Sequence, residues 1–178
     1  MNLLQRLIGH FKTITRHRHQ VIRHCAKAGI LWQGLRHDLS KYSPTEFLPG
    51  VRYYNGQHSP TEDERRAEGC SRAWMHHKGR NRHHWEYWTD IHLAEKCYKS
   101  VPMPKRYLAE MICDRMAASK IYKGQDYTNA SPLEYLQHGK TRQAMHPETY
   151  AQLEQFLTVL RDDGEEEMFR RLRAWLKA

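Results

Sequence analysis

Residues 103–122 read MPKRYLAEMICDRMAASKIY, and this stretch has the sequence features of a long α-helix. Pro104 fits the first turn of a helix, because the N–H that proline lacks would be unpaired there anyway. Positions at helical spacing follow at Tyr107, Met111, Asp114 and Ala118. Gly124 marks the expected end of the helix. Asp114 therefore falls in mid-helix among apolar neighbours, where a carboxylate is seldom buried unless it is paired or binds a metal.

The rest of the chain also reads as helical. Val and Ile, which favour strands, together number only 11. We expect a long first helix that ends near Gly29, a short helix through His37, and two last helices separated by Gly164. These patterns predict an all-α fold of about seven to nine helices in a single domain, residues 1–178. Its metal-site core would span about residues 17–124, with packing helices in residues 132–178.

The pattern Ser-Pro-x-Glu occurs three times and predicts three helix starts. In each copy Ser can cap the helix, Pro fits the first turn, and Glu at the third position closes a capping box. The copies begin at Ser43, Ser59 and Ser131. They are not a structural repeat, because the segments that follow them do not resemble one another.

Charge and composition narrow the class of protein. Lys and Arg number 29 against 20 acidic residues, which gives a net charge of +9, and residues 1–41 alone carry eight basic residues and one acid. Such an excess indicates an anionic partner, either a phosphate-bearing ligand or a nucleic acid, although a solvated helix face carries the same charges. No apolar run is long enough to cross a membrane, and the four cysteines form no C-x-x-C pair. We therefore expect a cytoplasmic protein with no membrane partner.

Histidine is the most informative residue type, because imidazole is the commonest protein ligand of metals and the chain has 13 of them. A His37-Asp38 doublet lies in the stretch GLRHDLSK, residues 34–41, with His17 upstream. Four more histidines follow within nine residues, in the stretch AWMHHKGRNRHHWEYW: His76, His77, His83 and His84. Others are expected at the surface or at helix caps, namely His10, His58, His92, His138 and His146.

The order His, His-Asp, His, His, Asp in a helical chain resembles the HD superfamily of metal-dependent phosphohydrolases. The family motif His-Asp-x-x-Lys is matched by HDLSK, residues 37–41, and His17 precedes Val21 as the first His of the family precedes a Val. The resemblance implies one or two divalent metal ions, of Mn, Fe, Co, Zn or Mg. The implied ligands are His17, His37, Asp38, Asp114 and one member of each pair, His76 or His77 and His83 or His84. More narrowly, the phrases HDLSKYSPTEF, AWMHHKGRNRHHWEYW and MPKRYLAEMICDRMAASKIY are similar to those of a small uncharacterised family of bacterial and phage proteins.

The resemblance also implies an activity. A metal-activated water would hydrolyse a small phosphate ester, with a nucleotide as the leading candidate for the anionic substrate. Lys41 would neutralise a phosphate, and Glu110, one turn before Asp114, would orient a ligand histidine. Further phosphate oxygens would be bound by Lys78, Arg80 and Arg82. The alternative for each of these cations is an ordinary exposed side chain.

Two other functions fit the same residues. One is an HD-type diiron oxygenase, because some relatives of the superfamily use the same ligands to activate oxygen. The other is a basic protein that binds nucleic acid or a protein partner and holds a metal only for structure. The substrate, the number of metals, the inward-facing histidine of each pair and the oligomeric state stay open at this point.

Overall fold

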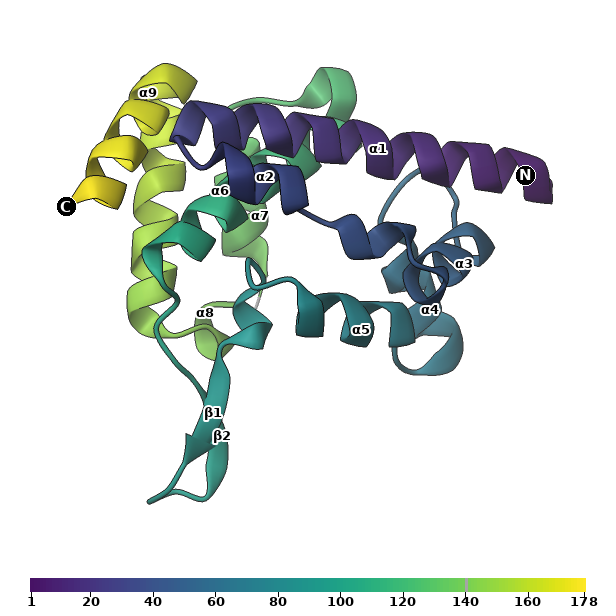
Figure 1. Cartoon of the computed structure of the whole chain (residues 1–178), viewed down its shortest axis with the longest axis horizontal. Coiled ribbons are helices and arrows are strands. Elements are labelled where there is room, and N and C mark those ends of the chain that lie inside the picture. Colours follow the sequence, from purple (N-terminus) through teal and green to yellow (C-terminus); the bar gives the residue numbers. More distant parts are fainter. Residues whose placement is uncertain (140) are drawn as a thin grey trace.

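The computed structural model describes residues 1–139 and 141–178, and α-helices account for most of them (Figure 1). Within these ranges the α-helices are α1 (Leu3–Ala28), α2 (Leu31–Arg36), α3 (Pro44–Arg52), α4 (Pro60–Glu68), α5 (Arg72–Arg80), α6 (Lys105–Lys123), α7 (Ser131–His138), α8 (Thr141–Ala144) and α9 (Pro147–Lys177). Short 3-10 helices are η1 (Leu39–Tyr42), η2 (Trp85–Tyr87) and η3 (Gly124–Asp126). The prediction of an all-α domain with seven to nine helices is confirmed.

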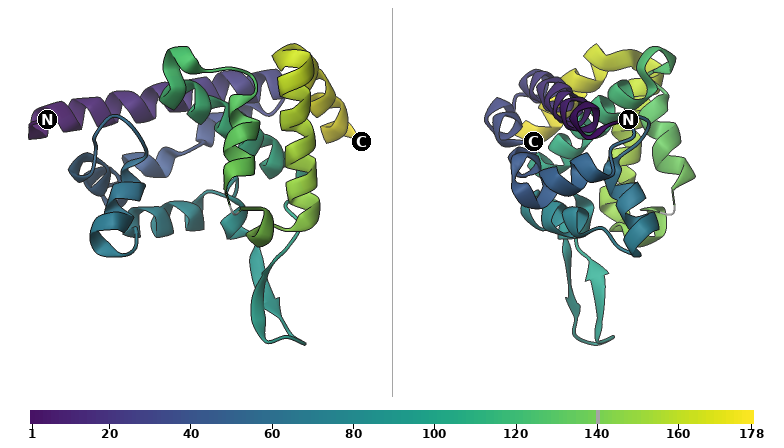
Figure 2. Two further views of the ribbon diagram at one scale, coloured as in Figure 1. Left: turned by 180° about the vertical axis from the view of Figure 1, so that it is seen from behind. Right: turned by 90° about the vertical axis from the view of Figure 1, so that its right-hand side faces the viewer.

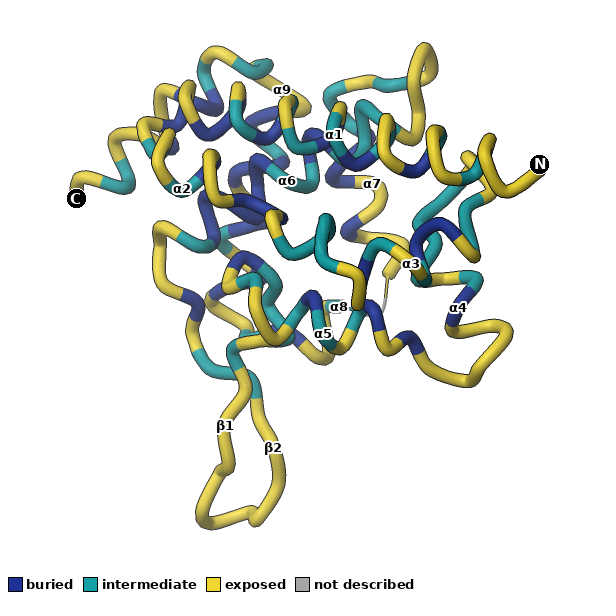
Figure 3. The backbone as a smooth tube through the Cα atoms, turned by 45° about the vertical axis from the view of Figure 1, so that its right-hand side comes forward, coloured by how far each residue is buried: buried dark blue, intermediate teal, exposed yellow. Residues whose placement is uncertain are grey.

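One hairpin departs from the helical pattern. Its strands β1 (Thr89–His92) and β2 (Cys97–Ser100) pair antiparallel, with Thr89 opposite Ser100. The hairpin projects away from the helices (Figure 1), and its strands are exposed except for the half-buried Ser100 (Figure 3). The fold of the helices therefore does not depend on these strands.

Several helix ends lie where the sequence predicts them. α1 ends at Gly29, which has a φ of 80° and so adopts the left-handed conformation that glycine tolerates best. α6 begins after Pro104 and ends before Gly124. Gly164 interrupts α9 with non-helical angles, so the two expected last helices form one kinked helix.

The three Ser-Pro-x-Glu copies begin helices, but not through the capping box that the pattern predicts. Helices begin at Pro44, Pro60 and Ser131, yet in none of the three does a serine side chain cap the helix. The glutamate of the first copy, Glu46, accepts hydrogen bonds from two histidines of α5 instead. The prediction of three capping boxes is therefore wrong, because at the first site a distant partner takes the glutamate.

The apolar core lies among α6, α7, α9 and the C-terminal half of α1. At its centre α6 buries Leu108, Ala109, Ile112, Cys113, Met116 and Ala117 completely. By contrast, the only buried hydrophobic residues in residues 31–100 are Val51 and Ala73. The buried backbone of α6 and the mixed exposure of α3 to α5 are visible in Figure 3.

α1 joins these two parts of the molecule. It packs against α6 and α9 through its C-terminal half and against α3 nearer its N-terminus (Figures 1 and 2). The segment from α2 to α5 returns beneath it, and α6 then re-enters the core. None of the helices within the described ranges combines the length and apolar character needed to cross a bilayer.

Candidate metal centre

Seven of the candidate ligands converge where α1, α5, α6 and the connection between α2 and η1 meet. They are His17 on α1, His37 and Asp38 in the connection, His77 on α5, His83 and His84 in the loop after α5, and Asp114 on α6. Residues separated by up to 97 positions in the sequence thus meet at one place. Packing of α1 against α6, with α5 beneath, brings them together.

Asp38 occupies the middle of this cluster. Its Oδ2 atom lies 3.3 Å from Nε2 of His37 and 3.7 Å from Nε2 of His17. Its Oδ1 atom lies 3.3 Å from Nε2 of His77 and 3.5 Å from Nε2 of His83. The backbone of Asp38 is left-handed, with a φ of 54°. Such a conformation is tolerated by Asp more easily than by most residues, and it is found at functional sites more often than elsewhere.

The two carboxylate oxygens face two sets of potential ligands. The first set is His17, His37, Asp38 and Asp114, and the second is Asp38, His77, His83 and His84. In each set one nitrogen or oxygen atom per residue lies within 4.8 Å of all the others. Ligands about 2.0–2.2 Å from a common ion span comparable distances, and imidazole with carboxylate suits Zn, Fe, Mn and Co. The donor set and its spacing therefore fit a divalent cation on either side of Asp38.

Burial of unpaired polar atoms supports the same interpretation. Seven buried atoms of the cluster have no hydrogen-bond partner in the described residues: both Asp38 oxygens and Nε2 of His17, His37, His77, His83 and His84. An ion pair with Lys41, whose Nζ lies 2.7 Å from Oδ2, is the close charged contact of Asp38 outside the histidines. Buried polar atoms are nearly always paired, since each unpaired one costs free energy. So many lone-pair donors turned toward one another are what a metal site requires.

Two glutamates contact the other ring nitrogen, Nδ1, of three candidate ligand histidines. His37 Nδ1 donates to Oε1 of Glu110 at 2.8 Å, and His83 Nδ1 lies 3.1 Å from the same oxygen. His77 Nδ1 donates to Oε2 of Glu46 at 2.7 Å. Donation from Nδ1 leaves Nε2 as the lone-pair nitrogen that faces the centre, which is the usual arrangement of metal-binding histidines. Glu110 thus contacts one histidine of each set.

Neighbouring histidines and Lys41 keep the carboxylates of the centre ionised. Burial alone would raise the pKa of Asp38, but His37, Lys41 and His77 together hold it well below its usual range. Burial also opposes ionisation of Glu110, yet hydrogen bonds from His37 and His83 lower its pKa to about 2. These carboxylates are therefore ionised at neutral pH.

The structure separates the members of the first histidine pair but not of the second. His77 points into the centre, whereas His76 lies outside both sets, is partly exposed and donates from Nδ1 to Glu46 at 2.6 Å. His83 and His84 both belong to the second set. His10, expected at the surface, is instead buried, because its ring packs between Phe47, Tyr54 and the backbone of Gly50.

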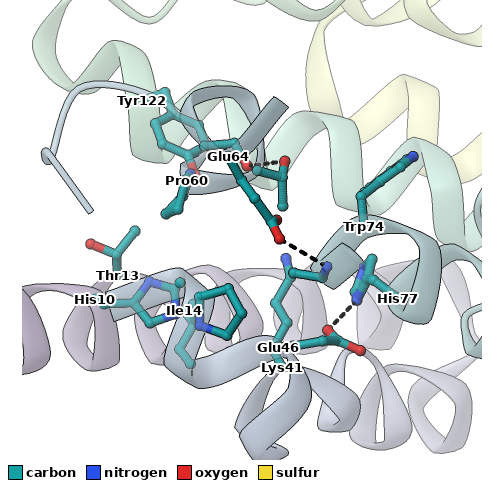
Figure 4. Close-up of a pocket in the computed structure, with 15 residues that line it drawn as sticks. His10, Thr13, Ile14, Lys41, Glu46, Pro60, Glu64, Trp74, His77 and Tyr122 are labelled. Carbon is teal, nitrogen blue, oxygen red and sulfur yellow. Dashed lines mark hydrogen bonds and ion pairs between the residues drawn. The ribbon is translucent and has the colours of Figure 1, made fainter. Parts of the chain in front are cut away.

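A pocket opens on one side of the centre (Figure 4). Lys41 and His77 line it on the side of the centre, with Glu46 hydrogen-bonded to His77, and Glu64 and Tyr122 also line it. Lys41 is partly exposed, at 31%, and so connects the pocket with Asp38. Burial alone would lower the pKa of Lys41, but Asp38 and Asp114 outweigh burial and raise it, so the ammonium stays protonated.

A groove opens on the other side. We call it the arginine groove; its exposed lining residues include Trp32, Arg36, Arg80, Arg82 and Arg106, with the half-buried Tyr107 among them. Its buried lining residues are Glu110 and His83. Two of the predicted phosphate-binding residues, Arg80 and Arg82, therefore lie in one groove, whereas Lys78 lines neither hollow.

The fold and the site define an all-α protein with a buried His/Asp centre. A family model described as a family of unknown function (DUF5662) matches residues 6–159, and the chain belongs to this family. No curated protein and no solved structure matches the chain.

Proposed function

We propose that this protein is a metal-dependent phosphohydrolase that acts on a small phosphate ester. The observation that carries the proposal is the set of seven buried atoms around Asp38 that make no hydrogen bond, backed by carboxylates that fix the orientation of the histidines. A bound divalent cation lowers the pKa of a coordinated water and polarises a phosphoryl oxygen, which is the chemistry that ester hydrolysis needs.

The ligand residues divide into two groups that share one carboxylate. His17, His37 and Asp114 would hold one ion, the second set of histidines would hold another, and Asp38 would contribute an oxygen to each. Glu110 and Glu46 act as positioning residues, because they contact ring nitrogens rather than the centre itself.

Lys41 is the cation best placed to meet the substrate. It lines the pocket beside the centre, and its Nζ already lies 2.7 Å from Asp38. A phosphate oxygen that approached from the pocket would meet this protonated amine as a point charge. The leading candidate for the alcohol portion of the ester is a nucleoside.

Metal analysis followed by a phosphatase screen tests the proposal. Protein purified without chelator is assayed by mass spectrometry for bound metal, and then with p-nitrophenyl phosphate and nucleoside monophosphates in the presence of each metal found. Asp38→Asn should lose both metal and turnover, whereas Asp126→Asn, at an exposed carboxylate, should keep both.

Two results would contradict the proposal. One is full metal occupancy in Asp38→Asn, and the other is metal-loaded protein that hydrolyses none of the esters. Iron as the only bound metal, together with oxygen uptake and a mixed-valence paramagnetic signal, would indicate a diiron oxygenase instead.

A further inference from the structure

The arginine groove gathers four guanidinium groups from three places in the chain. Arg36 ends α2, Arg80 ends α5 and Arg82 follows it, and Arg106 lies in the first turn of α6. The groove encloses about 630 Å³, which is large for a single phosphate group. This concentration of positive charge is part of the tertiary structure, since the segments are far apart in the sequence.

These arginines lack carboxylate partners. Among the described residues none of the four makes an ion pair, whereas three exposed arginines of α9 do: Arg161, Arg170 and Arg171. The one carboxylate that lines the groove, Glu110, already accepts hydrogen bonds from His37 and Gln33. Four like charges beside one another, with no ion pair to a carboxylate among the described residues, favour an anionic ligand with several negative groups.

The position of Arg106 adds to this excess of positive charge. α6 has no acidic residue in its first turn, where Lys105 and Arg106 stand instead. Cations at a helix N-terminus oppose the helix dipole, and an anion bound there would relieve the conflict. The groove thus has a local reason, besides its charge, to bind phosphate.

Aromatic side chains complete the groove. Trp32 is 80% exposed, although most large aromatic side chains of this protein are packed. Tyr107 lies beside two of the guanidinium groups, with its ring centre 5.9 Å from Cζ of Arg82 and 4.8 Å from Cζ of Arg106. An exposed aromatic ring beside a basic groove is typical of proteins on which nucleic-acid bases stack.

We propose that the arginine groove binds a single-stranded nucleic acid, with backbone phosphates on the arginines and a base stacked on Trp32. The buried residues of the groove, Glu110 and His83, belong to the metal centre, so the bound strand would run past that centre. The idea that the bound strand is also the substrate depends on the function proposed above. The binding of the strand itself does not depend on it.

Fluorescence anisotropy with labelled 12-nucleotide oligo(dT) and oligo(U) tests the groove. Arg36→Ala with Arg106→Ala should weaken binding at least about tenfold, because two charge-assisted phosphate contacts are lost. The matched control is Arg161→Ala with Arg170→Ala, which removes the same charge from α9 and should change affinity less than about twofold. Trp32→Ala should weaken binding at least about fivefold, and Tyr135→Ala, at an equally exposed ring, should not.

Salt titration gives a second readout. If all four arginines contact phosphates, the logarithm of the association constant should fall with the logarithm of salt concentration with a slope of about −2.8. Circular dichroism of each variant checks that the fold is retained. Equal weakening by the groove variant and the α9 control would overturn the proposal, since net charge alone would then explain binding.

Two further results would also overturn it. One is no binding at low salt, and the other is competition by a free nucleoside triphosphate as effective as competition by the unlabelled strand. Lys41→Met separates the two proposals, because Lys41 lines the pocket and not the groove, so the variant should lower turnover and keep strand binding. Strand binding by a protein without phosphatase activity would remove the proposed function alone, and a phosphatase that binds no strand would remove the groove assignment alone.

Discussion

The two parts of this molecule are ordered by different means. The apolar part, α6, α7, α9 and the C-terminal half of α1, packs buried Leu, Met, Phe and Ile side chains. The polar part, residues 31–100, buries Val51 and Ala73 but also a set of polar side chains: His37, Asp38, Glu46, Glu64, Ser71, His77 and His83. Apolar burial stabilises the first part directly, whereas the second places charged groups out of water and must compensate for their lost hydration.

The difference indicates what a metal bound at the candidate centre would do for the fold. Asp38, His77 and His83 join α5 and the loop after it to the connection between α2 and η1, and Glu46 adds α3. These contacts take the place that a hydrophobic core has elsewhere. We therefore expect the polar part, and not the apolar part, to depend on bound metal.

The largest effect should follow metal removal. Chelation should lower hydrogen-exchange protection across residues 31–100 and leave α6 and α9 protected, because α6 keeps its apolar packing when Asp114 loses the metal, whereas the polar part has little apolar packing to keep. The loss would amount to about 4 kcal/mol if the metal is present at a thousand times its dissociation constant. Asp38→Asn should already have the loosened pattern and should not respond to chelator. Equal loss of protection in both parts would break the comparison.

A cavity made in the apolar part should destabilise the protein whether or not metal is bound. Leu157 is completely buried, so Leu157→Ala should lower the free energy of unfolding by about 2–5 kcal/mol. The cost should be the same with and without metal, as measured by urea denaturation of both forms. A cost that appeared only in metal-bound protein would mean that the two parts are not energetically distinct.

Acid should destabilise both parts through buried histidines, of which His10 and His24 are two. Burial lowers the pKa of His10, which packs against the polar part, and of His24, against the apolar core, to about 4 in each case. The unfolded chain binds these protons near pH 6.5, so the stability is present above pH 6.5 and is lost as the pH falls to 4. Each histidine accounts for up to about 3 kcal/mol of this loss.

Urea denaturation of chelated protein between pH 7.5 and 4.5 measures this effect without metal release. His24→Asn should flatten the pH dependence, and His19→Asn, at an exposed position of the same helix, should leave it unchanged. The same slope in all three proteins would show that His24 does not control acid stability.

The smallest effect should come from the positioning glutamates. Glu46→Gln and Glu110→Gln should each weaken metal binding about 10- to 100-fold, because an amide orients the imidazole less strongly than a carboxylate. Glu110 contacts His37 and His83, one from each set, so its variant should weaken both sites. Calorimetric titration measures the affinities, with Glu62→Gln as the exposed control. An unchanged affinity for metal in both variants would show that the two glutamates do not position the ligand histidines.

Much of the fold could be predicted from local sequence, because helix boundaries depend on neighbouring residues. Gly29 and Gly124 end helices where glycine is expected, and Pro104 precedes one. The hairpin was not predicted, since its short strands contain few of the residues that favour strands and contact little of the body.

The centre was predictable in its residue types and less so in its partners. Asp114 and the His37-Asp38 doublet stand out in the sequence, whereas the choice between His76 and His77 depends on how α5 rotates against α3. Glu46 reads locally as a capping residue, and only tertiary packing turns it toward a histidine 31 positions away. The pairing of Arg36 with Arg106 in one groove was invisible for the same reason.

Anomalous X-ray diffraction from crystals of protein loaded with its metal tests the central claim most directly. We predict strong anomalous peaks on one or both sides of the Asp38 carboxylate, about 2.0–2.3 Å from its oxygens and from the Nε2 atoms that face it. Loaded protein with no peak within that distance of Asp38, or with peaks only at exposed carboxylates, would contradict the account.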